Sequence, residues 1–260
     1  RSSIDLIVPK GTEDAYLAVG WTGFKSIINA IEDIGFHLKV YLEGASLTPN
    51  EGEEAYMRDD LRVAGVLLLE SPYIDTFSEN ISSSTGMDPS VLETSGSDAI
   101  VDWVYVEVRA ESDATIVLTG KSALLQRDGD IVATDGVSNL EFEAIEAGDY
   151  YIAIYHRNHL GILSAIPITL PTASIDFSTD ASLAEGGINA LVEVQAGVFA
   201  LLGGDYDAND QVQNTDITKM IEFIGVSGYD QADMDMNGEV QNTDLNTINK
   251  NIGKGIQFLK

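Results

Sequence analysis

The chain has 260 residues, 44% of them hydrophobic, and its 14 Lys and Arg residues against 42 Asp and Glu residues give a net charge of −28. The apolar content is sufficient for a packed core, whereas so acidic a surface disfavours binding to nucleic acids and anionic membranes. The absence of cysteine excludes disulfides, thiol catalysis and cysteine metal sites. No apolar run approaches the roughly 18 residues of a membrane span, and a chain that begins at Arg1 is expected to be a processed product or an excised fragment.

The N-terminal segment, residues 1–36, is predicted to contain two short strands and one helix. Apolar stretches at residues 4–9 and 15–21 are separated by turn-forming residues and are typical of strands. Residues 24–35 are interpreted as an amphipathic helix that ends at a glycine, with an extended segment as the alternative. The apolar residues at helical spacing are Phe24, Ile27, Ile28, Ile31 and Ile34.

Residues 37–202 show the pattern of a β domain. Apolar residues alternate with others in residues 37–44, and residues 100–110 place Val104, Val106 and Val108 on the strand face opposite Trp103 and Tyr105. An Asp-Gly pair at residues 128–129 indicates a hairpin turn, and the serine-rich residues 78–90 are expected to form a loop. Many short strands separated by turns predict a mainly β fold, specifically a β-sandwich of the immunoglobulin-like or prealbumin-like kind.

The last segment, residues 203–260, contains a near-duplication with a period of 28 residues. The stretch GDYDANDQVQNTD, which begins at Gly204, returns as ADMDMNGEVQNTD from Ala232. Numbering each loop from its first aspartate places oxygen-bearing side chains at positions 1, 3, 5 and 12 of both copies. These residues are Asp205, Asp207, Asn209 and Asp216 in the first loop, and Asp233, Asp235, Asn237 and Asp244 in the second.

This spacing is typical of calcium-binding loops. Ca²⁺ takes about six to eight oxygen ligands, which alternate side chains, a carboxylate at position 12 and the backbone carbonyl at position 7 can supply. The position-7 residues are Gln211 and Glu239, and helices are expected to follow at residues 216–225 and 244–253. The sequence therefore predicts two Ca²⁺ sites. The alternative, a pair of Asx-rich turns that cap helices without metal, is disfavoured by the identical ligand positions of the two copies.

Position 6 distinguishes the two loops. This position needs a positive φ and is usually glycine, as at Gly238. The first loop has Asp210 instead, which tolerates the left-handed region better than most residues. The first loop is therefore predicted to be the more strained and weaker of the two.

The duplicated loop and helix resemble the dockerin type I module, in which each half is a calcium loop followed by one helix, often called an F-hand. The resemblance covers residues 203–260 and rests on the ligand pattern. It implies a small α-helical module after the β domain. Dockerins bind cohesin partners, so the resemblance also implies a possible cohesin-type partner.

A wider resemblance involves the β domain. The strings VDWVYVEVR from Val101, ALLQRDGDIV from Ala123 and YYIAIYHRNHLG from Tyr150 are similar to strings in secreted Bacteroidetes surface proteins that carry dockerin-like tails. Such proteins are mostly described as hemagglutinin-like. This resemblance implies an extracellular or cell-surface location rather than a particular activity.

Two other groups of polar residues are candidate sites. Asp128, Asp130 and Asp135 could form a further calcium site, although a hairpin turn requires the same Asp-Gly residues without metal. His156 and His159 would need a third ligand to hold zinc, so they are interpreted as a polar strand end that fixes the neighbouring turn.

No feature of the sequence promotes catalysis. Asp59 and Asp60 are flanked by arginines and are interpreted as paired surface charges. Nucleophile elbows, zinc-protease motifs and phosphate-binding glycine loops are absent from the sequence. A glycosidase needs only two suitably spaced carboxylates, which so acidic a chain can always supply. We expect a non-enzymatic protein.

Three hypotheses about function follow. The first is an extracellular calcium-binding structural or adhesion protein that assembles into a surface filament, with the strand at residues 3–9 completing the sheet of another copy. The second is a carbohydrate-binding or enzyme-associated module that its tail docks to a cohesin-type scaffold; exposed Trp21, Trp103 or Tyr73 would form its sugar platform. The third is a tail that clamps onto its own β domain and protects it from unfolding.

Overall fold

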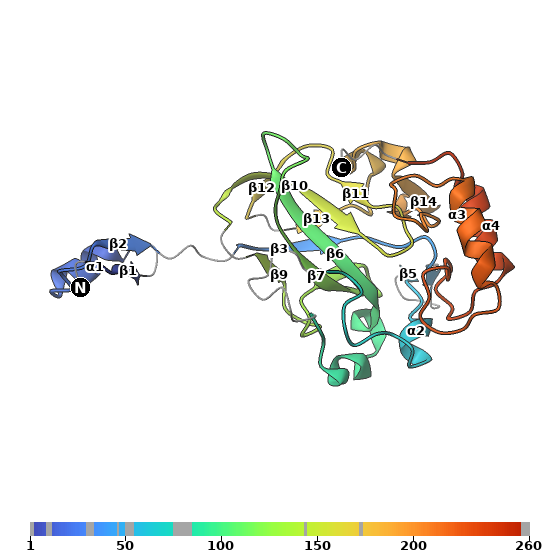
Figure 1. Ribbon diagram of the computed structural model, residues 1–260, viewed down its shortest axis with the longest axis horizontal. Helices are drawn as coiled ribbons and strands as arrows, with labels where there is room; N and C mark the ends of the chain where they lie inside the picture. Colours follow the sequence, from blue (N-terminus) through green and yellow to red (C-terminus); the bar gives the residue numbers. More distant parts are fainter. Residues whose placement is uncertain are drawn as a thin grey trace.

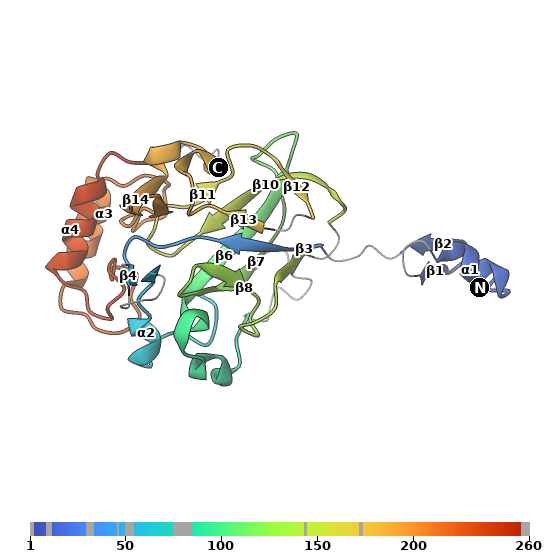
Figure 2. The ribbon, with the colours of Figure 1, turned by 180° about the vertical axis from the view of Figure 1, so that it is seen from behind.

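The computed structural model describes residues 3–8, 12–29, 34–45, 47–49, 55–74, 85–142, 145–171 and 174–255. A small N-terminal unit lies apart from the rest of the chain (Figure 1). The opposite view shows the same separation, with the C-terminal helices on the far side of the main body from this unit (Figure 2). The main body is therefore flanked by the N-terminal unit on one side and by the duplicated tail on the other.

The N-terminal unit consists of strand β1 (Asp5–Val8), helix α1 (Glu13–Ala18) and strand β2 (Ser26–Asn29). The strand predicted at residues 4–9 is confirmed as β1, which pairs in parallel with β2 of its own chain. The strand predicted at residues 15–21 is wrong, because residues 15–18 belong to helix α1. The first turn of α1 contains the acidic Glu13 and Asp14, which favour a helix N-terminus.

The helix predicted over residues 24–35 is also wrong. Within that range the described residues form β2 and the beginning of strand β3 (Ile34–Lys39), while residues 30–33 lie outside the described part of the chain. Isoleucine is β-branched and favours the extended backbone, so pairing with β1 outweighs the helical spacing.

A mixed sheet forms the body. Among the described residues, nine strands are connected in the order β11-β10-β6-β7-β8-β3-β13, with β12 also pairing with β10 and β9 with β3. All these pairs are antiparallel except β3 with β13. Besides β3, the strands are β6 (Ile100–Ala110), β7 (Val117–Gln126), β8 (Asp130–Val132), β9 (Leu140–Phe142), β10 (Gly148–Tyr155), β11 (Ile162–Leu163), β12 (Ile168–Leu170) and β13 (Ser174–Asp176).

Strand β6 lies at the centre of the core and is buried on both faces. Trp103 and Val104, which point in opposite directions, are each fully buried. The alternation predicted for residues 100–110 is confirmed, and so is the hairpin, in which β7 and β8 flank a turn with Gly129 at positive φ. The mainly β fold is thereby confirmed, with strands packed around one continuous hydrophobic cluster.

Shorter elements surround the sheet. They are β4 (Thr48–Pro49), β5 (Ala55–Tyr56), α2 (Asp60–Val63), the 3₁₀ turns η1 (Pro89–Glu93), η2 (Gly96–Asp98), η3 (Ala181–Leu183) and η4 (Gly187–Asn189), and the hairpin of β14 (Leu191–Gln195) and β15 (Val198–Leu201). Of the loop predicted at residues 78–90, residues 78–84 lie outside the described part of the chain.

The tail contains helix α3 (Asn214–Met220), which continues as the 3₁₀ turn η5 (Ile221–Phe223), and helix α4 (Asn242–Asn251). The two helices lie side by side against the main body (Figure 1). Helices are thus present where the sequence predicts them, each beginning two residues earlier. None of the helices in the described residues is long and apolar enough to span a membrane.

Candidate functional site

The structure brings the predicted carboxylates together in two equivalent groups. Asp205, Asp207 and Asp216 form one group, and Asp233, Asp235 and Asp244 form the other. In each group, one oxygen from each residue lies within 4.8 Å of the other two. Oxygens that share one Ca²⁺ at about 2.3–2.6 Å must lie within about 5 Å of each other, so both groups have the separation that such an ion requires.

Backbone amides fix the carboxylates in the same way in both loops. In the first loop, Asp205 accepts hydrogen bonds from the N–H groups of Asn209 at 3.0 Å and Asp210 at 3.1 Å. Asp216 accepts from the N–H groups of Asp207 at 3.2 Å and Gln213 at 2.7 Å. The position-5 side chain, Asn209, also accepts a hydrogen bond, from the position-7 N–H group at 3.0 Å.

The second loop repeats this pattern. Asp233 accepts hydrogen bonds from the N–H groups of Asn237 at 3.1 Å and Gly238 at 2.9 Å, and Asp244 accepts from those of Asp235 at 2.9 Å and Gln241 at 2.7 Å. Backbone hydrogen bonds alone thus orient the carboxylate oxygens of the two loops in the same way.

Positive φ values occur at two positions of each loop. At position 6, Asp210 has φ 65° and Gly238 has φ 85°, as the sequence predicts. At position 4, Ala208 has φ 53° and Met236 has φ 57°. Position 4 carries no signal in the sequence, because neither alanine nor methionine favours the left-handed region.

The two halves of the tail hold each other through exchanged backbone hydrogen bonds. The N–H group of Val212, just after the first loop, donates to the carbonyl of Lys254 at 2.9 Å, and Gly253 donates back to the Val212 carbonyl. The N–H group of Val240 donates to Val226 at 2.8 Å, and Gly225 donates back. Since 225 and 253 differ by the 28-residue period, the tail has an approximate two-fold relation.

The predicted position-7 residues lie next to these exchanged backbone hydrogen bonds. Gln211 forms an isolated bridge with Gly255, and Glu239 forms one with Ser227. A small core lies beneath the two loops and is formed by Val212, Met220, Ala232, Met234, Val240 and Ile248. The two loops and helices are therefore one folding unit rather than two independent sites.

Burial strongly perturbs the carboxylates. It raises the pKa of Asp205 and of Asp233 to about 7, and it also raises the pKa values of Asp216 and Asp244. Like charges within each group add to this effect. A bound divalent cation would remove both penalties, because it neutralises the carboxylates and replaces their lost hydration.

The donor set fits Ca²⁺ in a second respect. Asp207 Oδ1 is buried and has no hydrogen-bond partner in the part of the chain that the structure describes. An unpaired buried carboxylate oxygen is costly unless a cation coordinates it. All the predicted side-chain donors are oxygens of carboxylates or amides, which suits a hard cation.

One ion pair distinguishes the two loops. Lys219 Nζ lies 2.9 Å from Asp207 Oδ2, the position-3 carboxylate of the first loop. The residue one period later is Thr247, which donates a hydrogen bond to Thr243 O instead. The lysine would compete with a cation for Asp207, which would add to the disadvantage that Asp210 brings to the first loop.

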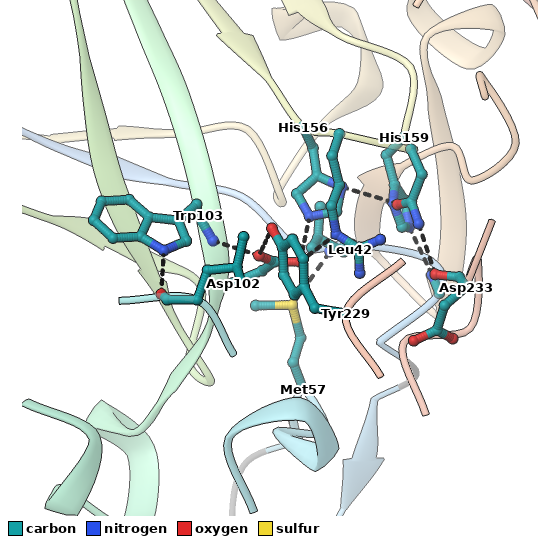
Figure 3. Close-up of polar contacts among 12 residues, drawn as sticks. Leu42, Met57, Asp102, Trp103, His156, His159, Tyr229 and Asp233 are labelled. Carbon is teal, nitrogen blue, oxygen red and sulfur yellow. Dashed lines mark hydrogen bonds and ion pairs between the residues drawn. The ribbon is translucent and has the colours of Figure 1, made fainter. Parts of the chain in front are cut away.

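The second loop is tied to the β body through Asp102, a fully buried residue of β6. Asp102 lies 2.9 Å from Arg157 Nε and 3.2 Å from His156 Nε2, and it accepts a hydrogen bond from the Tyr229 hydroxyl at 2.7 Å (Figure 3). The guanidinium of Arg157 stacks 4.4 Å from the centre of the Tyr229 ring and donates to the carbonyl of Asp230. Tyr229 and Asp230 lie four and three residues before Asp233, the first residue of the second loop. We call Asp102, His156, Arg157 and Tyr229 the latch.

The charge state of the latch follows from its partners. Although burial alone would raise it, the Arg157 guanidinium, His156 and Tyr229 hold the pKa of Asp102 well below its usual range. Burial lowers the pKa values of His156 and His159. Both histidines are therefore neutral, and the latch carries one buried ion pair, Asp102 with Arg157.

The next residues along the chain reach the second loop itself. Asn158 Nδ2 donates to the carbonyl of Asp233, the position-1 residue, at 2.6 Å (Figure 3). His159 Nδ1 lies 2.8 Å from Asn158 Oδ1, while His159 Nε2 accepts the N–H group of Gly44 at 2.9 Å. The sequence predicts that these residues form a polar strand end that fixes a turn. In the structure they also join the end of β10 to the tail.

Close backbone contact completes the interface. A Cβ atom at Gly44 would lie 1.8 Å from the carbonyl oxygen of Met234, so no other residue fits there. On the other side, Glu43 accepts hydrogen bonds from Lys250 at 2.6 Å, from Asn251 at 2.5 Å and from the Gly203 N–H group at 3.1 Å. Met236 of the second loop joins the hydrophobic core of the body.

The described residues bring together no further group of this kind at the remaining candidates. Asp128, Asp130 and Asp135 are not among the metal-compatible groups that the described residues form; the Asp128 carboxylate accepts the Asp130 N–H group at 3.2 Å and Asp135 accepts from Ser138. His37 is exposed on β3, away from the buried pair of histidines.

Two other interpretations can be compared with the structure. Asp60 pairs with Arg58, and Asp59 pairs with Arg62 at 2.8 Å, so the interpretation as paired charges is confirmed, although Asp59 is buried. A sugar platform that includes Trp103 is wrong. That side chain is fully buried and donates to the carbonyl of Leu68 at 2.8 Å.

Comparison with known proteins gives little further information. No family model matches the chain, and no curated protein matches it. Two solved structures are similar, both of a type II cohesin–X-dockerin complex from Acetivibrio cellulolyticus, one an N-terminal and the other a C-terminal interface mutant. Each alignment covers 58% of this chain and 81% of the other, at 19% and 20% identity, with a TM-score of 0.37.

Proposed function

We propose that residues 203–260 form a dockerin-like calcium-binding module that clamps onto the β-sandwich of the same chain, within a non-enzymatic structural or adhesion protein of the cell exterior. One observation carries the proposal: of two duplicated oxygen-lined loops, the second is joined to a buried ion pair of the body, since Tyr229 donates to Asp102 and Arg157 donates to the Asp230 carbonyl. The third hypothesis drawn from the sequence, an intramolecular clamp, is the one this geometry supports best.

Calcium would strengthen the clamp because the second loop is both a metal site and part of the interface. The carbonyl of Asp233 accepts the Asn158 side chain, while the Asp233 carboxylate faces Asp235 and Asp244. An ion that fixes this loop therefore fixes the surface that meets the body. Metal binding that occurs only in the folded state adds directly to the free energy of unfolding.

The composition suits a location outside the cell. Loops with this number of carboxylates bind Ca²⁺ with dissociation constants on the order of micromolar to submillimolar, so millimolar extracellular calcium would fill them. A net charge of −28 favours solubility and cation binding.

Docking of the tail to a cohesin-type scaffold is the second candidate function. Ile224 and Ile252 are related by the 28-residue period and are exposed by 47% and 42% on the tail. Paired apolar residues on an exposed surface suit a protein partner. Filament formation by strand donation has less support, since β1 already pairs with β2 of its own chain.

Thermal unfolding of the full chain with Ca²⁺ or with a chelator tests the clamp. We expect calcium to raise the melting temperature and to slow proteolysis of both the tail and the body. Gly44→Ala should reproduce the effect of the chelator, because its Cβ displaces Met234. Gly148→Ala is the matched control, since its Cβ makes only ordinary contacts with Tyr150. Melting that is insensitive to the chelator would contradict the proposal.

A further inference from the structure

A cleft of about 530 Å³ lies between the first calcium loop and the β body. Strands β6 and β10 contribute one wall, which includes Tyr105 and Tyr155, and Tyr73 lines it from the preceding segment. The first loop contributes the facing wall with Asp205, Ala208 and Asp210. The cleft is therefore built from both parts of the chain that the latch joins.

Ion pairs and hydrogen bonds hold the polar floor of the cleft in place. Arg109 donates to Glu107 at 2.8 Å through Nε and to the Tyr155 hydroxyl at 2.5 Å through Nη2. Its Nη1 donates to the carbonyl of Ala114 at 2.9 Å, and the side chain is almost fully buried. A floor whose side chains are fixed in this way is preorganised, which lowers the entropy lost when a ligand binds.

Arg157 offers an unused donor group at the same cleft. Its Nε and Nη1 groups are engaged by the latch, but its buried Nη2 has no hydrogen-bond partner among the described residues. The side chain is only 6% exposed. A buried guanidinium nitrogen without an acceptor is costly, so Arg157 is a residue of the cleft lining whose hydrogen-bonding capacity is not fully used.

Asp210 gives a second reason to expect a ligand. It occupies position 6 at φ 65°, where the second loop has glycine, and its side chain is almost fully buried in the cleft wall. A residue other than glycine in this conformation is strained, and such strain often accompanies a functional side chain. The departure of the first loop from the glycine pattern thus places a carboxylate in the cleft.

We infer that this cleft binds a neutral, polyhydroxylated ligand of the saccharide class. Tyrosine rings can pack against the apolar face of a sugar ring, while fixed donors and acceptors pair with hydroxyl groups that do both. Asp210 and Glu107 disfavour an anionic ligand, and a lining that is both apolar and polar suits a ring with an apolar face and hydroxyl groups. The inference rests on the proposed calcium-binding tail, since the first loop forms one wall.

The test is saturation-transfer NMR on the full chain in millimolar Ca²⁺. The probes are glucose, galactose, mannose and N-acetylglucosamine, with N-acetylneuraminic acid as an anionic comparison. We expect at least one neutral sugar to bind and the acidic sugar to bind at least tenfold more weakly. Binding of none of the neutral sugars, or a preference for the acidic one, would overturn the inference.

Variants of Asp210 separate the cleft from the metal site. Asp210→Gly removes the carboxylate and restores the glycine that position 6 favours, and Asp210→Asn removes only the charge. Both should weaken sugar binding at least tenfold, whereas Asp210→Gly should bind Ca²⁺ as tightly as the parent chain or more tightly by calorimetry. Glu222→Gln, at an exposed position of the tail outside both loops and outside the cleft lining, is the control and should leave sugar binding unchanged.

The outcomes distinguish this inference from the proposed function. Unchanged sugar binding in Asp210→Gly would overturn the assignment of the cleft while leaving the calcium clamp intact. Absence of Ca²⁺ binding in the parent chain would contradict the clamp, and sugar binding that Asp210→Gly abolishes would still support the cleft.

Discussion

The two loops of the tail have nearly the same ligands but different surroundings. The second loop, residues 233–244, is joined to the body through Asn158 and through Tyr229 of the latch. The first loop, residues 205–216, faces a cleft and carries both a strained Asp210 and the competing Lys219. Duplicated loops can therefore divide two tasks, one loop stabilising an interface while the other shapes a surface.

The largest effect is expected from Asp102→Asn, which removes the latch carboxylate without changing its shape. Arg157 would be left buried without its counter-ion, and breaking a buried ion pair in this way costs about 3–5 kcal/mol. Urea denaturation in calcium measures the loss. Asp60→Asn, which removes an exposed partner of Arg58, should cost under about 1 kcal/mol; equal losses for the two variants would contradict the role of the latch.

Removal of the position-12 carboxylates should show the asymmetry between the loops directly. Asp244→Ala should lower the free energy of unfolding in calcium by about 3 kcal/mol, the value expected when a ligand present at about 100 times its dissociation constant no longer binds. Asp216→Ala should cost less, because its loop contributes less to the interface. If Asp216→Ala proves the more damaging variant, the first loop must be the one that supports the body.

The latch should also make stability depend on pH. Asp102 has a folded-state pKa below its unfolded value, so its contribution to stability is fully present above about pH 4 and is lost as the pH falls below that value. Chelator-treated protein should therefore lose stability between about pH 4 and pH 2 more steeply than Asp102→Asn does. Parallel pH profiles for the two proteins, measured by urea denaturation, would show that Asp102 does not bind Arg157 as described.

The smallest effect is expected from exchanging the residues that distinguish the loops. Lys219→Thr, which copies Thr247, should tighten the first site by about 0.5 kcal/mol, the scale of an exposed ion pair that competes with the metal. Thr247→Lys should weaken the second site by a comparable amount. Calcium calorimetry at low and high salt checks both variants, and a salt-independent difference would exclude a charge effect.

Local spacing predicted which carboxylates come together. Asp205, Asp207 and Asp216 lie within twelve residues, so their convergence follows from the geometry of one loop. Strand β6 was equally clear, because residues 100–110 are rich in β-branched and aromatic residues, with Val104, Val106 and Val108 on the face opposite Trp103 and Tyr105. Contacts between neighbours in the sequence are the ones that a pattern can reveal.

The interface was not predictable in the same way. Asp102 meets His156 and Tyr229 across 54 and 127 residues, and no local pattern signals such pairs. The errors in the N-terminal unit have a related cause: isoleucines at helical spacing also suit a strand, and a distant partner, β1, decides between them. Buried polar contacts between distant segments therefore required the structure.

The central claim, that calcium in the second loop stabilises the interface with the body, is tested most directly by hydrogen exchange of the full chain with and without Ca²⁺. Removal of calcium should accelerate exchange in α4, in residues 156–160 and in residues 42–45 together, because these segments meet at the second loop. Faster exchange confined to the loops, with residues 156–160 and 42–45 unchanged, would contradict the claim.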